Sequence, residues 1–144
     1  MSLTNPTKKM SKSDTNEKSR IVITDDSTII KKKINKAVTD SEDVITFDPQ
    51  NRPGLSNLLQ VLSYAEGRGN PPESLARDLQ DSSKKAIKER LADAVDAMLS
   101  PVRERYKEII QNEKYLEDVA LQGAEKASAN AAQTMNLVHQ AIGF

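Results

Sequence analysis

The chain has 144 residues, enough for one domain with a buried core. It contains no Cys and a single His, which excludes disulfides, thiol nucleophiles and Cys-bound zinc and disfavours imidazole catalysis, so we expect no protein-bound metal site. The 21 basic side chains balance 21 acidic ones, and no apolar run approaches the roughly 20 residues of a membrane-spanning helix.

The amino-terminal end is polar and basic. Residues 1–36 carry nine Lys and Arg against four acids, so any bound anion is expected to meet this end of the chain. A solvated leader that binds nothing is the alternative interpretation. Residues 1–20 show no sustained period and predict a loop, whereas the β-branched run at residues 21–24 predicts a short strand.

Helical spacing of apolar residues begins after Asp25 and Asp26, which offer a carboxylate cap. It predicts a helix over residues 27–38, and the acids and prolines of residues 39–53 then predict a connector with an extended stretch. The apolar face of the first helix consists of Ile30, Ile34, Ala37 and Val38.

From Gly54 onward the pattern is that of a helical bundle, so the predicted fold class is mainly α. One helix should end near Gly67, a second short one begins at Pro71 and Pro72, and a third covers residues 83–111 with a kink at Pro101. A last helix follows, and Gly123 is a point where it could break. The expected inward-facing residues are Leu55, Leu58, Leu59, Leu62, Leu75, Leu79, Ile87, Leu91, Val95, Met98, Leu99, Val102, Tyr106, Ile109, Ile110, Leu116, Val119, Ala120, Ala127, Ala131, Met135, Val138 and Ile142.

One string in the leader carries chemistry. K-M-S-K-S consists of Lys9, Met10, Ser11, Lys12 and Ser13. On a flexible loop, its two ammonium groups can converge on one polyanion, while the hydroxyls and backbone N–H groups donate to phosphate oxygens. If that anion is the pyrophosphate leaving group of ATP, a lysine placed there stabilises the transition state more than the ground state. The alternative is a solvated Lys/Ser pentapeptide.

The wider context of this string resembles a known family. Segments along the whole chain are similar to the carboxyl-terminal part of bacterial-type and organellar tryptophanyl-tRNA synthetases. The related tyrosyl enzymes share the K-M-S-K-S loop but not the downstream Thr-Asp-Ser and Pro-Gly-x-Ser-Asn segments. The similar segments are residues 6–14, Asp25 and Asp26, the Lys-rich helix into residues 37–41, residues 53–59, residues 101–106 and residues 123–127.

The resemblance implies a class I enzyme, in which a Rossmann-type catalytic domain precedes a helical domain. Residues 1–26 would be the loop and the end of the catalytic domain, and residues 27–144 a helical, tRNA anticodon-binding-like domain. Such enzymes activate tryptophan with ATP, accompanied by Mg²⁺, and charge tRNA(Trp), usually as homodimers without membrane association. Lys12 matches the loop lysine expected on the leaving pyrophosphate, and Lys9 the other phosphate partner, with Met10, Ser11 and Ser13 over the nucleotide.

The sequence also departs from the family pattern. The H-I-G-H-like ATP motif and the tryptophan pocket, which precede this loop in the family, are missing. We therefore expect part of a tryptophan–tRNA ligase that is inactive alone, in the mitochondrial matrix or the bacterial cytoplasm. A stand-alone helical RNA-binding or scaffold module, and part of a tyrosyl enzyme, are the alternatives.

RNA-binding residues stay unassigned at this level. Basic side chains and tyrosines of the helical region could meet phosphates and bases, although a solvated helix face explains the charges equally well. Acid pairs such as Asp93 and Asp96 are interpreted as helix surface. The RNA candidates are Lys84, Lys85, Lys88, Arg90, Arg103, Arg105, Lys107, Tyr64, Tyr106 and Tyr115.

Overall fold

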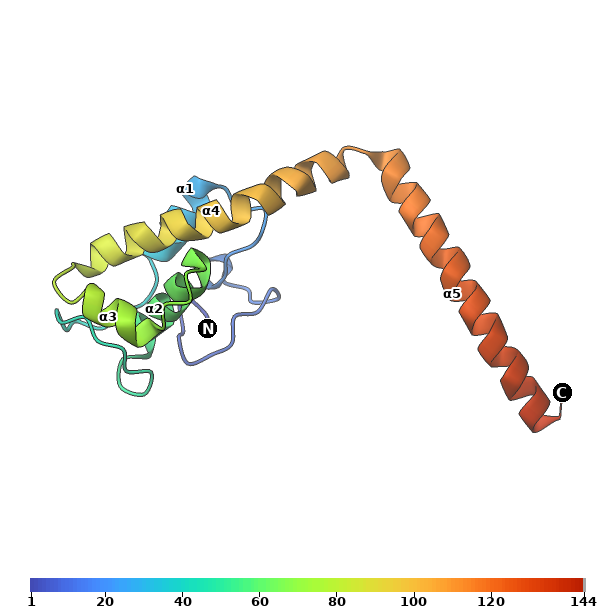
Figure 1. Ribbon diagram of the computed structural model, residues 1–144, viewed down its shortest axis with the longest axis horizontal. Helices are drawn as coiled ribbons and strands as arrows, with labels where there is room; N and C mark the ends of the chain where they lie inside the picture. Colours follow the sequence, from blue (N-terminus) through green and yellow to red (C-terminus); the bar gives the residue numbers. More distant parts are fainter. Residues whose placement is uncertain (144) are drawn as a thin grey trace. The chain divides into compact units, whose positions relative to one another are not determined.

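The computed structural model describes residues 1–143 and is helical, with no strand in that range. A short 3-10 helix, η1 (Glu17–Ser19), lies in the amino-terminal loop. The α-helices are α1 (Ser27–Asn35), α2 (Pro53–Glu66), α3 (Pro72–Asp78), α4 (Lys84–Ile110) and α5 (Glu113–Ile142) (Figure 1). The prediction of a mainly α fold is confirmed.

Backbone contacts divide the chain into two compact units, Met1–Arg103 and Glu104–Phe144. The first unit contains α1, α2, α3 and most of α4, and the second contains the end of α4 and α5. The predicted domain boundary at residue 26 separates the catalytic and helical domains that the family resemblance implies. The contact-based units do not test that boundary, so it stays a prediction. No Rossmann-type strand occurs within the described part of residues 1–26.

Two local predictions near α1 are wrong, and both errors have a physical reason. The β-branched run at residues 21–24 forms a turn, because Val22 N and Asp25 Oδ2 hydrogen-bond at 3.0 Å and Asp25 N returns to Val22 O. A β-branched run without a partner strand has no ladder to join. Helix α1 ends at Asn35 instead of residue 38, since Val38 N leaves the helix and donates to Leu3 O.

The helix ends follow the local chemistry of the sequence. Asp26 caps α1 by accepting from Ile29 N at 2.8 Å, and Gly67 ends α2 at a φ of 62°, a left-handed conformation that favours glycine. Helix α5 continues through Gly123, so the anticipated break is absent. Helix α4 continues through Pro101, and the kink there stays a prediction.

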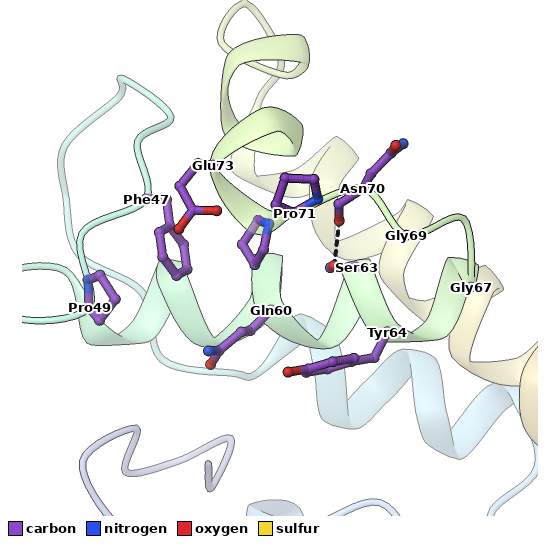
Figure 2. A pocket seen from close by; sticks show the side chains of 11 residues that line it. Phe47, Pro49, Gln60, Ser63, Tyr64, Gly67, Gly69, Asn70, Pro71 and Glu73 are labelled. Carbon is purple, nitrogen blue, oxygen red and sulfur yellow. Dashed lines mark hydrogen bonds between the residues drawn. The ribbon is translucent and has the colours of Figure 1, made fainter.

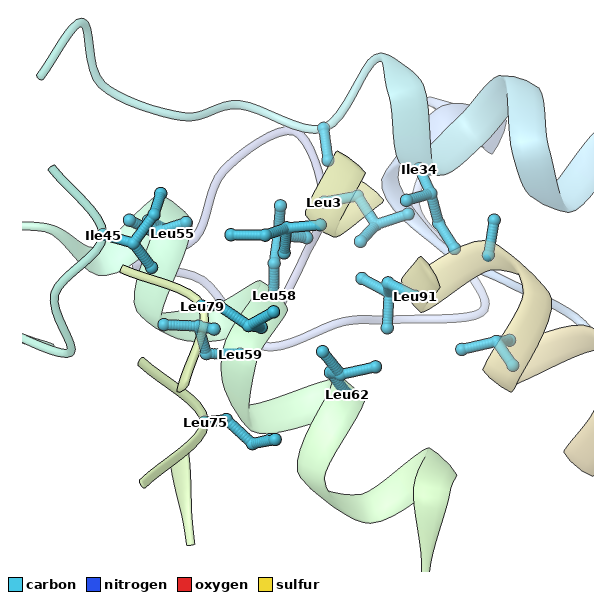
Figure 3. Close-up of a cluster of buried hydrophobic side chains, with 14 of the residues drawn as sticks. Leu3, Ile34, Ile45, Leu55, Leu58, Leu59, Leu62, Leu75, Leu79 and Leu91 are labelled. Atoms are coloured by element: carbon cyan, nitrogen blue, oxygen red, sulfur yellow. The ribbon is translucent and has the colours of Figure 1, made fainter. Parts of the chain in front are cut away.

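The hydrophobic core belongs to the first unit and centres on α2. All four predicted leucines of α2 are buried, in a cluster that also contains Ile34 of α1 and Leu91 of α4 (Figure 3). Burial along α4 ends after Val95, apart from Arg103. In α5 no residue is buried, so its predicted apolar stripe is uncovered. No helix within residues 1–143 meets the length and hydropathy of a membrane span.

Candidate functional site

Three backbone hydrogen bonds fix the base of the loop that carries K-M-S-K-S. Ser2 N donates to Lys8 O at 2.9 Å, and Leu3 N donates to Ser19 O at 2.9 Å. Leu3 O in turn accepts from Val38 N at 2.9 Å, just beyond α1. Because the Leu3 side chain is buried in the core, both ends of the loop are anchored to the first unit.

The K-M-S-K-S side chains project from this anchored base. Met10 packs partly against the hydrophobic core, whereas the other four side chains are exposed. The hydroxyls of Ser11 and Ser13 lie 3.0 Å apart. Within residues 1–143, neither Lys9 nor Lys12 has an acceptor within hydrogen-bonding distance. No group of the described residues therefore neutralises either ammonium group, and both are available to bind an external anion.

The segment after the loop is held by a buried ionic cluster that the sequence did not predict. The Asp25 carboxylate is buried and accepts from Lys33 Nζ at 2.6 Å. Arg103 Nη1, from α4, donates to the backbone carbonyl oxygen of Asp25 at 2.6 Å, and its Nη2 donates to Asp96 Oδ1 at 2.7 Å. Asp25 and Asp96 thus both have structural partners in this cluster, and the capping of α1 falls to Asp26.

The downstream family segments meet at a second buried arginine. Arg52 donates from Nε to Asp40 Oδ2 at 3.0 Å and from Nη2 to Asp40 Oδ1 at 2.6 Å. Its Nη1 also reaches Val44 O at 2.5 Å and Thr46 Oγ1 at 2.7 Å. The hydrogen bonds from Arg52 hold the pKa of the Asp40 carboxyl below its usual value. This fork therefore organises the connector between α1 and α2.

Four of the basic RNA candidates have partners from other parts of the fold, whereas Lys85, Arg105 and Lys107 pair with a neighbouring glutamate of α4. Lys84 Nζ donates to Asp40 O at 2.7 Å, and Lys88 Nζ to Ala37 O at 2.8 Å. Arg90 forms a two-point ion pair with Glu66, at 2.6 and 2.8 Å, which lowers the pKa of that carboxyl. Arg103 holds Asp25, as described above. These side chains stabilise the fold, and the sequence could not show it because each acceptor is distant along the chain.

The first unit carries several hollows, two of which differ in how well they suit an anion. The larger of the two, about 580 Å³, is lined by Phe47 and Pro49 of the connector, α2, the α2–α3 loop and the start of α3. In Figure 2, Ser63 Oγ of α2 donates to Asn70 O of that loop, at 2.5 Å. Its lining includes Glu73 but no Lys or Arg, so it does not suit a phosphate. The second, about 470 Å³, lies between η1 and α1 and is rich in lysine.

Comparison with known proteins gives the class. A family model described as "tRNA synthetases class I (W and Y)" matches residues 1–100. The chain therefore belongs to the class I tRNA synthetase family that serves tryptophan and tyrosine, which confirms the resemblance inferred from its motifs.

Individual relatives carry the tryptophan name. The chain is 41% identical over all 144 residues to proteins named tryptophan–tRNA ligase from Oceanobacillus iheyensis and Halalkalibacterium halodurans, and spans 43% of the length of each. The crystal structure of tryptophanyl-tRNA synthetase from Mycoplasma pneumoniae matches 75% of this chain and 34% of its own, with 31% identity and a TM-score of 0.61.

Proposed function

We propose that this chain serves the ATP-dependent activation of tryptophan and the charging of tRNA(Trp). The observation that carries the proposal is the K-M-S-K-S loop, anchored at its base, with the ammonium groups of Lys9 and Lys12 exposed and unpaired within the described residues. The identity to two tryptophan–tRNA ligases over the whole chain supports tryptophan over tyrosine.

The proposed chemistry concerns the leaving group. When the carboxylate of tryptophan attacks the α-phosphorus of ATP, negative charge accumulates on the departing pyrophosphate. Lys9 and Lys12 would bind that charge as it develops, and the hydroxyls of Ser11 and Ser13 would donate to phosphate oxygens. The exposed loop can move to release the product, while its base stays fixed by Leu3.

The loop alone does not make an enzyme. Without a surface that holds ATP against the amino acid, the proximity contribution of about 7–11 kcal/mol is lost, so the 144-residue chain should be inactive by itself. Residues 1–26 are proposed to be the end of a Rossmann-type catalytic domain, and residues 27–144 a tRNA anticodon-binding-like helical domain. We further propose a homodimer in the bacterial cytoplasm, with the mitochondrial matrix as the alternative.

Magnesium is expected to arrive with ATP. Within residues 1–143, no cluster of three or more His, Cys, Asp or Glu side chains could hold a metal ion. The phosphate oxygens of the nucleotide are the ligands that Mg²⁺ prefers. We therefore propose that Mg²⁺ is held by those oxygens.

A chimeric enzyme tests the function. The chain is joined to the part of the Oceanobacillus iheyensis ligase that its match leaves uncovered, and tryptophan-dependent pyrophosphate exchange is measured. We expect exchange by the chimera and none by the chain alone. Lys12→Ala should lower the exchange rate about a hundredfold to a thousandfold. Lys126→Ala, on an exposed part of α5, is the control and should leave the rate unchanged.

Two results would contradict the proposal. If the Lys9→Ala/Lys12→Ala chimera exchanges pyrophosphate at the normal rate, the two lysines do not act on the leaving group. If the chimera shows no tryptophan-dependent exchange while the intact Oceanobacillus iheyensis ligase does, the chain does not supply the missing part of a tryptophan enzyme.

A further inference from the structure

The lysine-rich hollow next to the K-M-S-K-S loop is a groove with two walls. One wall is residues 15–18, which begin two positions after the loop string. The other is a single face of α1 and its C-cap, formed by Ile29, Lys32, Lys33 and the C-cap residue Lys36 at the helical spacing of three and four. The opposite face of α1, with Ile30 and Ile34, is buried in the core, so the groove wall is held rigidly.

The charges in the groove are not balanced by the protein. Lys33 is neutralised by the buried carboxylate of Asp25 at 2.6 Å, and only its stem lines the wall. Lys18, Lys32 and Lys36 are exposed, and within residues 1–143 none of them has a carboxylate within ion-pair distance. Glu17 is the one acid in the lining. Three free ammonium groups against one carboxylate leave a net positive groove.

The lysines of the groove repel one another. Lys32 in the last turn of α1 and Lys36 at its C-cap lie four residues apart, where like charges repel by a few tenths of a kcal/mol, although the helix dipole favours cations at this end. The other lysines of α1 and α4 are placed against acids or carbonyls: Lys31 on Asp93 at 2.9 Å, for example. The lysines of the first unit without a partner in the described residues thus lie in this groove and in the adjoining loop, which indicates a polyanion from outside the chain.

The groove suits a polynucleotide backbone better than a free nucleotide. No glycine occurs before Gly54, so the groove has no glycine-rich turn whose N–H groups could surround a triphosphate. No arginine lines it either, and lysines on flexible stems act as point charges. Such charges suit a row of phosphodiesters, while Ile29 and the lysine stems offer apolar surface to ribose.

We propose that Lys18, Lys32 and Lys36 form an RNA-backbone site, which carries phosphates of the tRNA past the K-M-S-K-S loop. The inference rests on the proposed function, since it assigns the RNA surface of the same enzyme. Contacts of this kind position the RNA without reading its sequence. Glu17 limits the attraction at one rim of the groove.

Binding of a fluorescent tRNA(Trp) transcript to the 144-residue chain, measured by anisotropy over a range of salt concentrations, tests the site. The variant Lys18→Gln/Lys32→Gln/Lys36→Gln should bind at least tenfold more weakly at about 0.1 M salt, and its logarithmic salt slope should be shallower by about 2, because each phosphate contact contributes about 0.7–0.9. Glu17→Gln should tighten binding by a few fold.

A matched control removes the same charge elsewhere. Arg68→Gln/Arg77→Gln/Lys126→Gln changes three exposed cations outside the groove, none of them an RNA candidate, and should keep the wild-type salt slope. Circular dichroism checks that both triple variants fold. The inference is overturned if the wild-type chain does not bind the transcript, if the groove variant binds like wild type, or if the control loses as much affinity.

An ATP titration separates the two anion chemistries. If ATP binds the isolated chain and the groove lysines control that binding, the groove is a mononucleotide site and the RNA inference is wrong. Pyrophosphate exchange by the chimera needs no RNA, so it tests the proposed function independently. If the chimera exchanges pyrophosphate normally and the groove variant binds RNA like wild type, the proposed RNA site is wrong and the proposed function still holds.

Discussion

Arg52 satisfies its guanidinium within the chain at a buried position, where an unpaired charge would be costly. Its donors reach both oxygens of Asp40 as well as carbonyl and hydroxyl oxygens of residues 42–46. The connector between α1 and α2 has no helix or strand whose backbone hydrogen bonds could hold it, and the hydrogen bonds from Arg52 hold it instead.

Removal of this arginine should destabilise the first unit. Arg52→Ala leaves Asp40 without its charged donor and several acceptors without a partner, so the free energy of unfolding should fall by about 2–4 kcal/mol. Urea unfolding followed by circular dichroism measures the loss. Arg105→Ala, which breaks only an exposed pair with Glu108, is the control and should change stability by less than about 0.5 kcal/mol. Equal effects of both variants would contradict the role of Arg52.

Stability should also depend on acid through two carboxyls. The pKa values of Asp40 and Glu66 are lowered by hydrogen bonds from Arg52 and Arg90. A lowered folded pKa means that the stabilisation is present above the unfolded values of about 4 and is lost as the pH falls through the folded pKa. The free energy of unfolding should therefore decline below about pH 4. Asp40→Asn should flatten that decline, and an unchanged pH profile would refute the assignment.

At the level of the elements, α2 depends on a close approach that only glycine permits. A Cβ at Gly54 would lie 2.5 Å from Val38 O and 3.3 Å from Thr39 Cα, both backbone atoms. Gly54→Ala should therefore lower the unfolding free energy by about 1–3 kcal/mol, since the backbone after α1 must shift. A thermal melt of the chain measures this effect.

Gly123 provides the opposite case for comparison. Nothing lies within 4 Å of a Cβ at Gly123, in the middle of α5. Gly123→Ala should stabilise helix α5 by roughly 1 kcal/mol, the difference in helix propensity between alanine and glycine. It should leave the free energy of unfolding of the first unit unchanged. If both substitutions act alike, the contact at Gly54 does not control stability.

These elements show which features local sequence can predict. The spacing of Leu55, Leu58, Leu59 and Leu62 predicts the buried face of α2, and Asp26 predicts the start of α1, because period and capping act within a few residues. The Arg103–Asp25 contact joins residues 78 positions apart and has no local signal. The K-M-S-K-S loop can be recognised as a string in the sequence. The groove beside it cannot, because it forms only where residues 15–18 lie against α1 in the folded chain.

Across the whole molecule, the cationic side chains fall into two groups: those exposed to solvent and those paired within the fold. The excess of positive charge in residues 1–36 survives folding as exposed lysines of the loop and groove, whereas several cations of α4 are used inside the first unit. The anion-binding capacity of the chain is thus concentrated near its amino-terminal end, as the proposed functions require.

The second unit should be far less stable than the first. Helix α5 buries no residue, and an isolated helix gains little stability from propensity alone. Amides of α5 should therefore exchange with an opening free energy of about 0–1 kcal/mol, while those of α2 should approach the global value of several kcal/mol. Hydrogen exchange with mass spectrometry measures both helices in one sample. Protection of α5 equal to that of α2 at low chain concentration would contradict this, and protection that appears only at high concentration would mean that a second copy covers its apolar stripe.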